Sequence, residues 1–242
     1  MLSIFKKEIR SFLSSLIAYV VIIVFLLLIG LFTWVFADSN VLSLGYANLD
    51  TLFLMAPWVF IFLISAITMR SFSEEIKQGT FEILSTKPVT DFQIILGKYF
   101  AAVVLVTFAI IPTLIYFYSV YQLGLPKGNI DIGATWGSYI GLLFLGASYA
   151  AIGIFSSAVT PNQIVAFILG MFLCFFFFLG FQQLSNLGLF GQWDSFVQSL
   201  GIQFHYESIS RGVIDTRDIV YFVSLISVFL GLTFISLDSR KW

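Results

Sequence analysis

Residues 70–98 form a segment dense in charged and polar side chains, and it reads RSFSEEIKQGTFEILSTKPVTDFQIILGK. Acidic residues are interspersed there with apolar ones: Glu74, Glu75 and Glu82 lie among Phe72, Ile76, Phe81, Ile83 and Leu84. A short amphipathic helix of this kind can dock in a groove of a partner protein, where carboxylates pair with basic residues and apolar side chains fill a pocket. The alternative is a helix at a membrane surface whose charged face is solvated.

Local signals divide this segment into short helices. Gly79 interrupts the first helical pattern, and Thr80 is suited to cap a second one over residues 81–84. Pro88 ends the second pattern, because proline cannot continue a helix. Thr90 is expected to cap a further helix that leads into the next apolar run.

No catalytic motif accompanies the segment. Gly97-Lys98 lacks the preceding glycine and the following Ser or Thr of a phosphate-binding G-x-x-x-x-G-K-[ST] loop. His205 is the sole histidine, and we expect it to be a polar residue at the membrane interface. Neither H-E-x-x-H nor G-x-S-x-G occurs. The chain is therefore predicted not to be an enzyme and to bind no cofactor or metal directly.

The elements that carry these residues are predicted to lie in a membrane. Apolar residues make up 59% of the 242 residues and charged residues only 10%, against about 25% charged in a typical soluble domain. The mean hydropathy of +0.99 leaves too little polar surface for a soluble enzyme, a secreted binding module or a disordered scaffold. The net charge of -1 gives no basic excess that would indicate a nucleic-acid partner.

Six uncharged runs are close to the length of about 20 apolar residues that a membrane-spanning helix needs. They cover residues 14–36, 52–69, 99–121, 135–157, 164–181 and 219–237. We predict a single all-α transmembrane domain over residues 1–242, in which the first run is a retained span. Because the runs contain no ionisable residue, a proton-coupled transporter is disfavoured, and energy must come from elsewhere.

Basic residues set the expected orientation, since short loops rich in Lys and Arg stay in the cytoplasm. With both termini inside, nine of the twelve Lys and Arg residues are cytoplasmic: Lys6, Lys7, Arg10, Arg70, Lys77, Lys87, Lys98, Arg240 and Lys241. Arg70 and Lys98 would then extend to the inner headgroups from the two mouths of the 70–98 loop. Acidic residues of the external loops, Asp218 among them, are expected to be solvated.

Small residues in the fourth run predict close helix packing. Gly137 and Gly141 form a G-x-x-x-G pair, and a ridge of small residues continues through Gly146, Ala150, Gly153 and Ser157. Such a ridge lets helix backbones approach closely. We favour packing inside the bundle, and the alternative is a subunit interface.

The 70–98 segment also resembles a known family. Its residues follow the pattern E-x-x-x-G-T-x-E-x-L-x-x-x-P-V from Glu75 to Val89, and Gly97-Lys98 follows at the start of the third run. Residues 208–215, SISRGVID, match as well. These features are similar to those of ABC-2 type permeases, the membrane subunits of ATP-binding-cassette exporters, and the likeness covers the whole chain. Within the family, the overall likeness is to permease subunits associated with gliding motility.

The resemblance implies a type V exporter-like permease fold with six spans. Its coupling loop would dock on a cytoplasmic ABC ATPase subunit, which uses the ATP, through Glu74, Glu75, Gly79, Thr80, Phe81, Glu82, Leu84 and Pro88. A second permease subunit, identical or different, would complete the unit in the lipid of a bacterial inner membrane. The alternative is a structural anchor or scaffold of a larger envelope complex that transports nothing itself.

The external loop, residues 182–218, carries a second functional hypothesis. Phe190, Trp193, Val197 and Leu200 fall on one face of a helix predicted there. The resemblance implies that such an element caps the outer mouth of the pathway as a gate. The alternative is a membrane-surface helix with no gating role.

Overall fold

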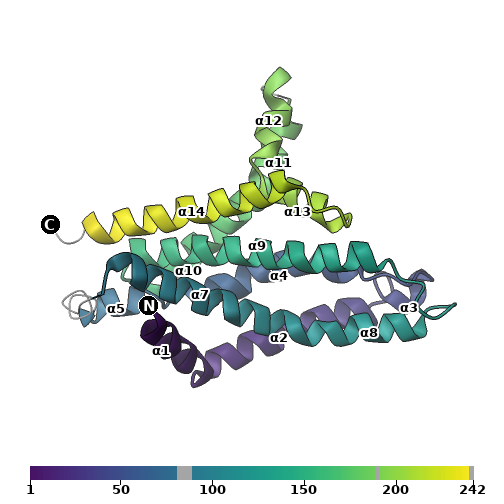
Figure 1. Ribbon diagram of the computed structural model, residues 1–242, viewed down its shortest axis with the longest axis horizontal. Helices are drawn as coiled ribbons and strands as arrows, with labels where there is room; N and C mark the ends of the chain where they lie inside the picture. The colour runs from purple at the N-terminus through teal and green to yellow at the C-terminus, as the bar shows by residue number, and fades with distance from the viewer. Residues whose placement is uncertain (81–88, 189–190, 240–242) are drawn as a thin grey trace.

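The computed structural model describes residues 1–80, 89–188 and 191–239 (Figure 1). These residues fold into helices, and no strand occurs among them. The predicted all-α class is therefore confirmed.

Long helices follow the apolar runs of the sequence. They are α2 (Leu16–Trp34), α4 (Asp50–Thr68), α7 (Asp91–Ile110) continued by α8 (Leu114–Leu123), α9 (Ile132–Val159), α10 (Gln163–Phe175) continued by α11 (Phe181–Asn186), and α14 (Thr216–Asp238). In the described part of the chain, five helices are long and apolar enough to cross a membrane. α1 (Leu2–Leu13), bent by 68° relative to residues 18–34, makes a sixth span if the pair is counted as one.

Short elements join and flank these helices. They are α3 (Val41–Leu44), α5 (Ser73–Lys77), η1 (Ile111–Thr113) at Pro112, the π-helical turn η2 (Phe176–Gly180), η3 (Gly191–Trp193), α12 (Asp194–Ser199) and α13 (Ile202–Ser210). α11 and α12 project from the side of the bundle (Figure 1). α1, α5 and the last turns of α14 lie at one end of it, which we call the α1–α5 end (Figure 1).

α9 is the centre of the bundle, packed against α4, α7, α10 and α14. A Cβ atom at Gly153 would lie 2.0 Å from Thr68 Oγ1 of α4, and one at Gly146 would lie 2.7 Å from Val106 Cγ1 of α7. The small-residue ridge therefore lets α9 touch its neighbours inside this chain, as we favoured. Cys174 of α10 is also fully buried.

Side-chain caps fix the starts of two long helices, and the cap at Thr90 is the one that the sequence predicts. Thr90 Oγ1 accepts from Gln93 N at 3.4 Å at the start of α7, and Asn162 Oδ1 accepts from Ile164 N at 3.0 Å at the start of α10. α7 then continues without a break to Ile110. The helix that Thr90 caps is therefore continuous with the third apolar run, and Lys98 lies within it.

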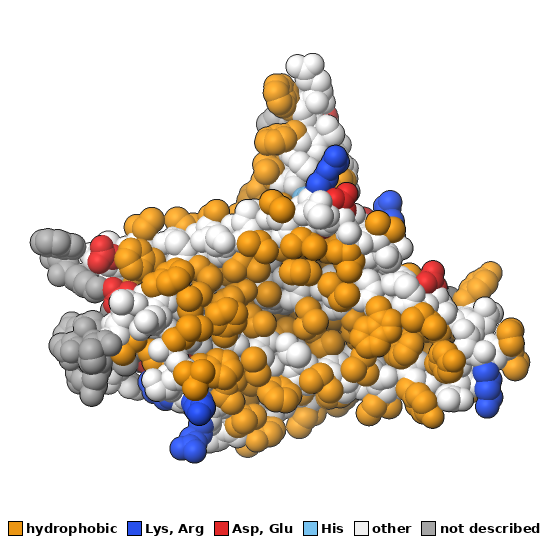
Figure 2. All heavy atoms as spheres, in the orientation of Figure 1, with side chains coloured by type: hydrophobic (Ala, Val, Ile, Leu, Met, Phe, Trp, Pro, Cys, Tyr) orange, Lys and Arg blue, Asp and Glu red, His pale blue; other side chains and the backbone are white. Residues whose placement is uncertain are grey.

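On the face that Figure 2 shows, apolar side chains cover the body of the bundle, and charged ones lie at its ends and around the base of the projecting segment. Many large apolar residues of the long helices are exposed, including Ile23, Leu54, Phe172 and Ile235. Such a surface is the one a membrane-spanning bundle presents to lipid or to partner helices.

The positive-inside pattern generates a topology prediction. A cysteine replacing exposed Gln78 at the α1–α5 end should react with a membrane-impermeant thiol reagent only from the cytoplasmic side, and one replacing exposed Lys127 at the opposite end only from outside. Buried Cys174 should stay unreactive and serves as the internal control. Labelling of both positions from the same side would refute the orientation.

Packing of α9 generates a stability prediction. Gly153→Ala should lower the free energy of unfolding by about 1–3 kcal/mol, because the added methyl overlaps Thr68. Gly231→Ala is the matched control, since a Cβ there meets nothing within 4 Å and alanine should gain about 0.5–1 kcal/mol in a helix. Thermal unfolding in detergent measures both, and equal effects would show that the ridge does not depend on small residues.

Candidate functional site

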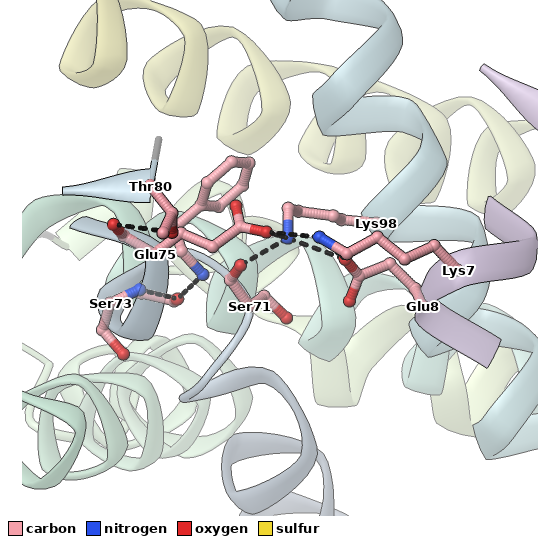
Figure 3. Close-up of polar contacts among 9 residues, drawn as sticks. Lys7, Glu8, Ser71, Ser73, Glu75, Thr80 and Lys98 are labelled. Atoms are coloured by element: carbon pink, nitrogen blue, oxygen red, sulfur yellow. Dashed lines mark hydrogen bonds and ion pairs between the residues drawn. The ribbon is translucent and has the colours of Figure 1, made fainter. Parts of the chain in front are cut away.

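Four charged side chains meet at the α1–α5 end (Figure 3). Lys98 of α7 has a side chain only 2% exposed, and its Nζ lies 2.9 Å from Glu8 Oε1 of α1 and 3.1 Å from Glu75 Oε1 of α5. Lys7 Nζ of α1 donates to the same Glu75 oxygen at 3.0 Å. We call Lys7, Glu8, Glu75 and Lys98 the lysine–glutamate cluster.

Lys98 has an oxygen partner for each of its three N–H donors. Besides the two carboxylates, its Nζ donates to the carbonyl oxygen of Ser71 at 2.6 Å and lies 5.1 Å from the centre of the Phe72 ring. Burying an ammonium group costs several kcal/mol unless its partners are in place. The cluster therefore holds α1, α5 and α7 together as one unit.

Gly97 allows α1 to come close enough for this. A Cβ atom at Gly97 would lie 3.1 Å from Ile4 Cγ2 of α1. The Gly97-Lys98 pair thus combines a close helix contact with a buried positive charge.

α5 is also fixed to α9. Ser157 Oγ accepts from the backbone N–H groups of Phe72 at 2.7 Å and Ser73 at 3.1 Å, which have no partner within a helix that starts here. Gly79, with φ of +66°, follows the C-cap residue Gln78 of α5, and Thr80 Oγ1 donates to Glu75 O at 3.3 Å. Both ends of this short helix are therefore held in place.

The exposed member of the cluster stays charged. Burial lowers the pKa of Lys7, but its hydrogen bond to Glu75 and the charges of Glu75 and Glu8 outweigh this, so that its pKa lies above the ordinary value. Because a raised lysine pKa contributes stability that is lost only in strongly alkaline solution, this part of the cluster is intact at neutral pH.

The residues predicted to form the docking site divide into three groups. Glu75 points into the lysine–glutamate cluster (Figure 3). Glu74 is half-buried and accepts from Gln78 Nε2, whereas Gly79 and Thr80 are exposed. Phe81, Glu82, Leu84 and Pro88 lie outside the described residues. Among the described residues of this segment, Lys77, Gln78, Gly79 and Thr80 are the exposed ones at the end of α5.

The expected position of Lys98 is wrong. Its side chain does not extend to the headgroups but is buried among Glu8, Glu75 and Phe72. The local sequence could not reveal this, because Glu8 is 90 positions away.

The expected solvation of Asp218 is also wrong, because this carboxylate is buried against His205. Both side chains are largely buried, and His205 Nδ1 lies 2.6 Å from Asp218 Oδ1. His205 Nε2 lies 2.9 Å from the carbonyl oxygen of Ser199, and the ring stacks on Tyr221 at 3.9 Å. This pair fastens α13 to the start of α14. Like the lysine–glutamate cluster, it joins two helices through buried polar side chains.

The predicted outer-gate residues lie on the projecting segment. Trp193 is 61% exposed and Leu200 40% exposed, and Val197 is half-buried on α12. Phe190 lies outside the described residues. Leu200 is held to α14 by the Tyr221 hydroxyl, which donates to its carbonyl oxygen at 2.7 Å. Whether this segment gates a pathway stays a prediction.

Within the described ranges, no group of three or more His, Cys, Asp or Glu side chains could hold a metal ion.

The charges of the lysine–glutamate cluster pair with one another across three helices. This arrangement is suited to transmitting movement between those helices.

A comparison with family models finds a match to ABC-2 family transporter protein over residues 39–199. This stretch includes α5 and the start of α7, with Glu75 and Lys98 of the cluster. No curated protein matches the chain.

The cluster generates a prediction on stability. Lys98→Met should lower the free energy of unfolding in detergent by about 3 kcal/mol or more, because Glu8 and Glu75 then lose their buried partner. Lys77→Met removes an exposed lysine from α5 and should change it by about 0.5 kcal/mol at most. If both variants unfolded alike, Lys98 would not hold the three helices together.

Proposed function

The chain belongs to the ABC-2 transporter family and is a multi-pass membrane subunit of an ABC transporter, whose ATPase activity lies in a separate subunit; we propose that it couples ATP hydrolysis by that partner to export. The α1–α5 end faces the cytoplasm, and the segment from α5 through residue 88 docks on the ATPase. The membrane is the inner membrane of a bacterium.

One observation carries this proposal: the docking segment begins in a helix tied by buried charge to two other helices. Glu75 of α5 is paired with Lys98 of α7 and with Lys7 of α1. A force applied to α5 by a moving ATPase is therefore passed directly to α7, which continues into a membrane span, and to α1, which precedes another. A loop that served only as a connection would not need this anchoring.

A second permease subunit completes the unit. α10 and α11 belong to one apolar helix, Gln163–Asn186. In its most apolar stretch of 18 residues, only 22% is buried inside the chain. A helix this exposed is suited to contact with another permease subunit, identical or different, in addition to lipid.

The finer likeness to gliding-motility permeases supports a role for the complex in energising cell-surface movement. The other candidate is a structural membrane anchor or scaffold that transports nothing itself. Substrate-stimulated ATP hydrolysis by the assembled complex separates them: stimulation supports transport, and unchanged hydrolysis across candidate substrates supports the anchor.

The docking segment generates the sharpest prediction on function. Glu82→Lys should weaken assembly with the ATPase by about 2–5 kcal/mol, because it reverses a charge in a contact that the partner's basic residues complete. Pull-down of the ATPase and coupled ATP hydrolysis measure this loss. The purified chain alone should hydrolyse no ATP.

The matched control is Glu207→Lys, the same charge reversal on exposed α13, which should leave assembly unchanged. Membrane abundance should be normal for both variants. Normal assembly and normal coupled hydrolysis of Glu82→Lys would mean that residues 70–98 are an ordinary interfacial connection.

A further inference from the structure

A groove with a charged end and an apolar end runs between α1–α2 and α4–α5. Its charged end is a cavity of about 370 Å³ at the α1–α5 end, and its apolar end is a cavity of about 540 Å³ between α2 and α4. Ala66 of α4 lines both cavities. Each volume is within the range of about 300–1,000 Å³ that is typical for ligand sites.

The charged end holds a buried donor and a buried acceptor that lack partners. Among the described residues, Arg70 Nε and Glu75 Oε2 are buried and make no hydrogen bond, and both residues line this cavity. A buried unpaired polar atom costs about 1–3 kcal/mol. A ligand that offers both an anionic oxygen and an N–H donor would satisfy the two atoms together.

The charge of the cavity lining is balanced. Three basic and three acidic side chains contribute to it, namely Lys7, Arg70, Lys98, Glu8, Glu74 and Glu75. Such a lining suits a ligand group that carries both charges, and gives no excess that would favour an anion alone.

The apolar end has the length of one lipid leaflet. On α4 it is lined from Met55 to Ala66 and on α2 from Val20 to Phe32, about 16–18 Å at 1.5 Å per residue. This is close to half of the roughly 30 Å hydrocarbon core of a bilayer. All of the side chains that line this cavity are hydrophobic.

We propose that this groove binds one zwitterionic aminophospholipid, of the phosphatidylethanolamine type, from the leaflet at the α1–α5 end. The lipid phosphate accepts a hydrogen bond from Arg70, and its primary ammonium group donates to Glu75 Oε2. An acyl chain lies along the apolar faces of α2 and α4. The inference concerns binding alone and does not depend on transport.

The headgroup chemistry separates this lipid from others. Phosphatidylglycerol has the phosphate but no cation for Glu75, and phosphatidylcholine has a quaternary ammonium without an N–H donor. Both share the acyl chains, so that a preference among the three lipids reports the charged end of the groove.

Native mass spectrometry of the purified full chain in detergent, with equal amounts of the three lipids added, tests the proposal. We expect one retained phosphatidylethanolamine per chain, in about tenfold preference over either of the other lipids, since each lacks a charge-assisted hydrogen bond. Equal retention of all three lipids, or retention of none, would overturn the proposal without reference to any variant.

Variants then locate the site. Ala66→Trp blocks the groove where the two cavities meet, and Arg70→Gln removes the phosphate partner; each should reduce retention of phosphatidylethanolamine about tenfold. Leu54→Trp on the exposed face of α4 and Lys77→Gln on α5, neither of which lines the groove, should leave retention unchanged. If Ala66→Trp instead abolished a dimer of this chain while lipid retention stayed the same, the groove would be a subunit interface and the lipid assignment would be wrong.

Discussion

The buried ammonium group of Lys98 is the constraint on which the α1–α5 end depends. A charge that is 2% exposed is tolerated only if acceptors surround it, so Glu8, Glu75 and the Ser71 carbonyl must all be brought to one point. α1 can reach that point because Gly97 leaves room for Ile4, and α5 is oriented there by Ser157 of α9. Three helices, α1, α5 and α7, are thus positioned by one charge.

Features that depend on neighbouring residues could be predicted from the sequence. Uncharged runs predict the long helices because a helix satisfies its own backbone groups in lipid. Thr90 predicts a cap through a side chain three residues from the N–H that it binds, and the glycine ridge of α9 predicts close packing. The partners of Lys98 and the pairing of His205 with Asp218 could not be predicted, because each joins elements that only the tertiary structure brings together. In both cases a residue expected in headgroups or in solvent, Lys98 or Asp218, is buried against a polar partner from another helix.

Glu75 links the two properties proposed for this end of the molecule. Its Oε1 atom holds Lys98 and Lys7, whereas its Oε2 atom is buried without a hydrogen-bond partner in a residue that lines the charged end of the groove. A lipid headgroup on Oε2 would therefore contact the same helix that begins the docking segment. Because both involve the Glu75 carboxylate, lipid binding should affect the movement of α5, and movement of α5 should affect lipid binding.

The central claim is that α1, α5 and the start of α7 move as one body because of Lys98. Its most direct test is the distance between spin labels on Lys6→Cys and Gln78→Cys, both exposed positions, in the complex with its ATPase. We predict one narrow distance distribution that is the same without nucleotide and with ATP, and that broadens when Lys98 is replaced by Met. A distance that shifts on ATP binding in the otherwise unchanged chain would show that α1 and α5 move independently, and would contradict the claim.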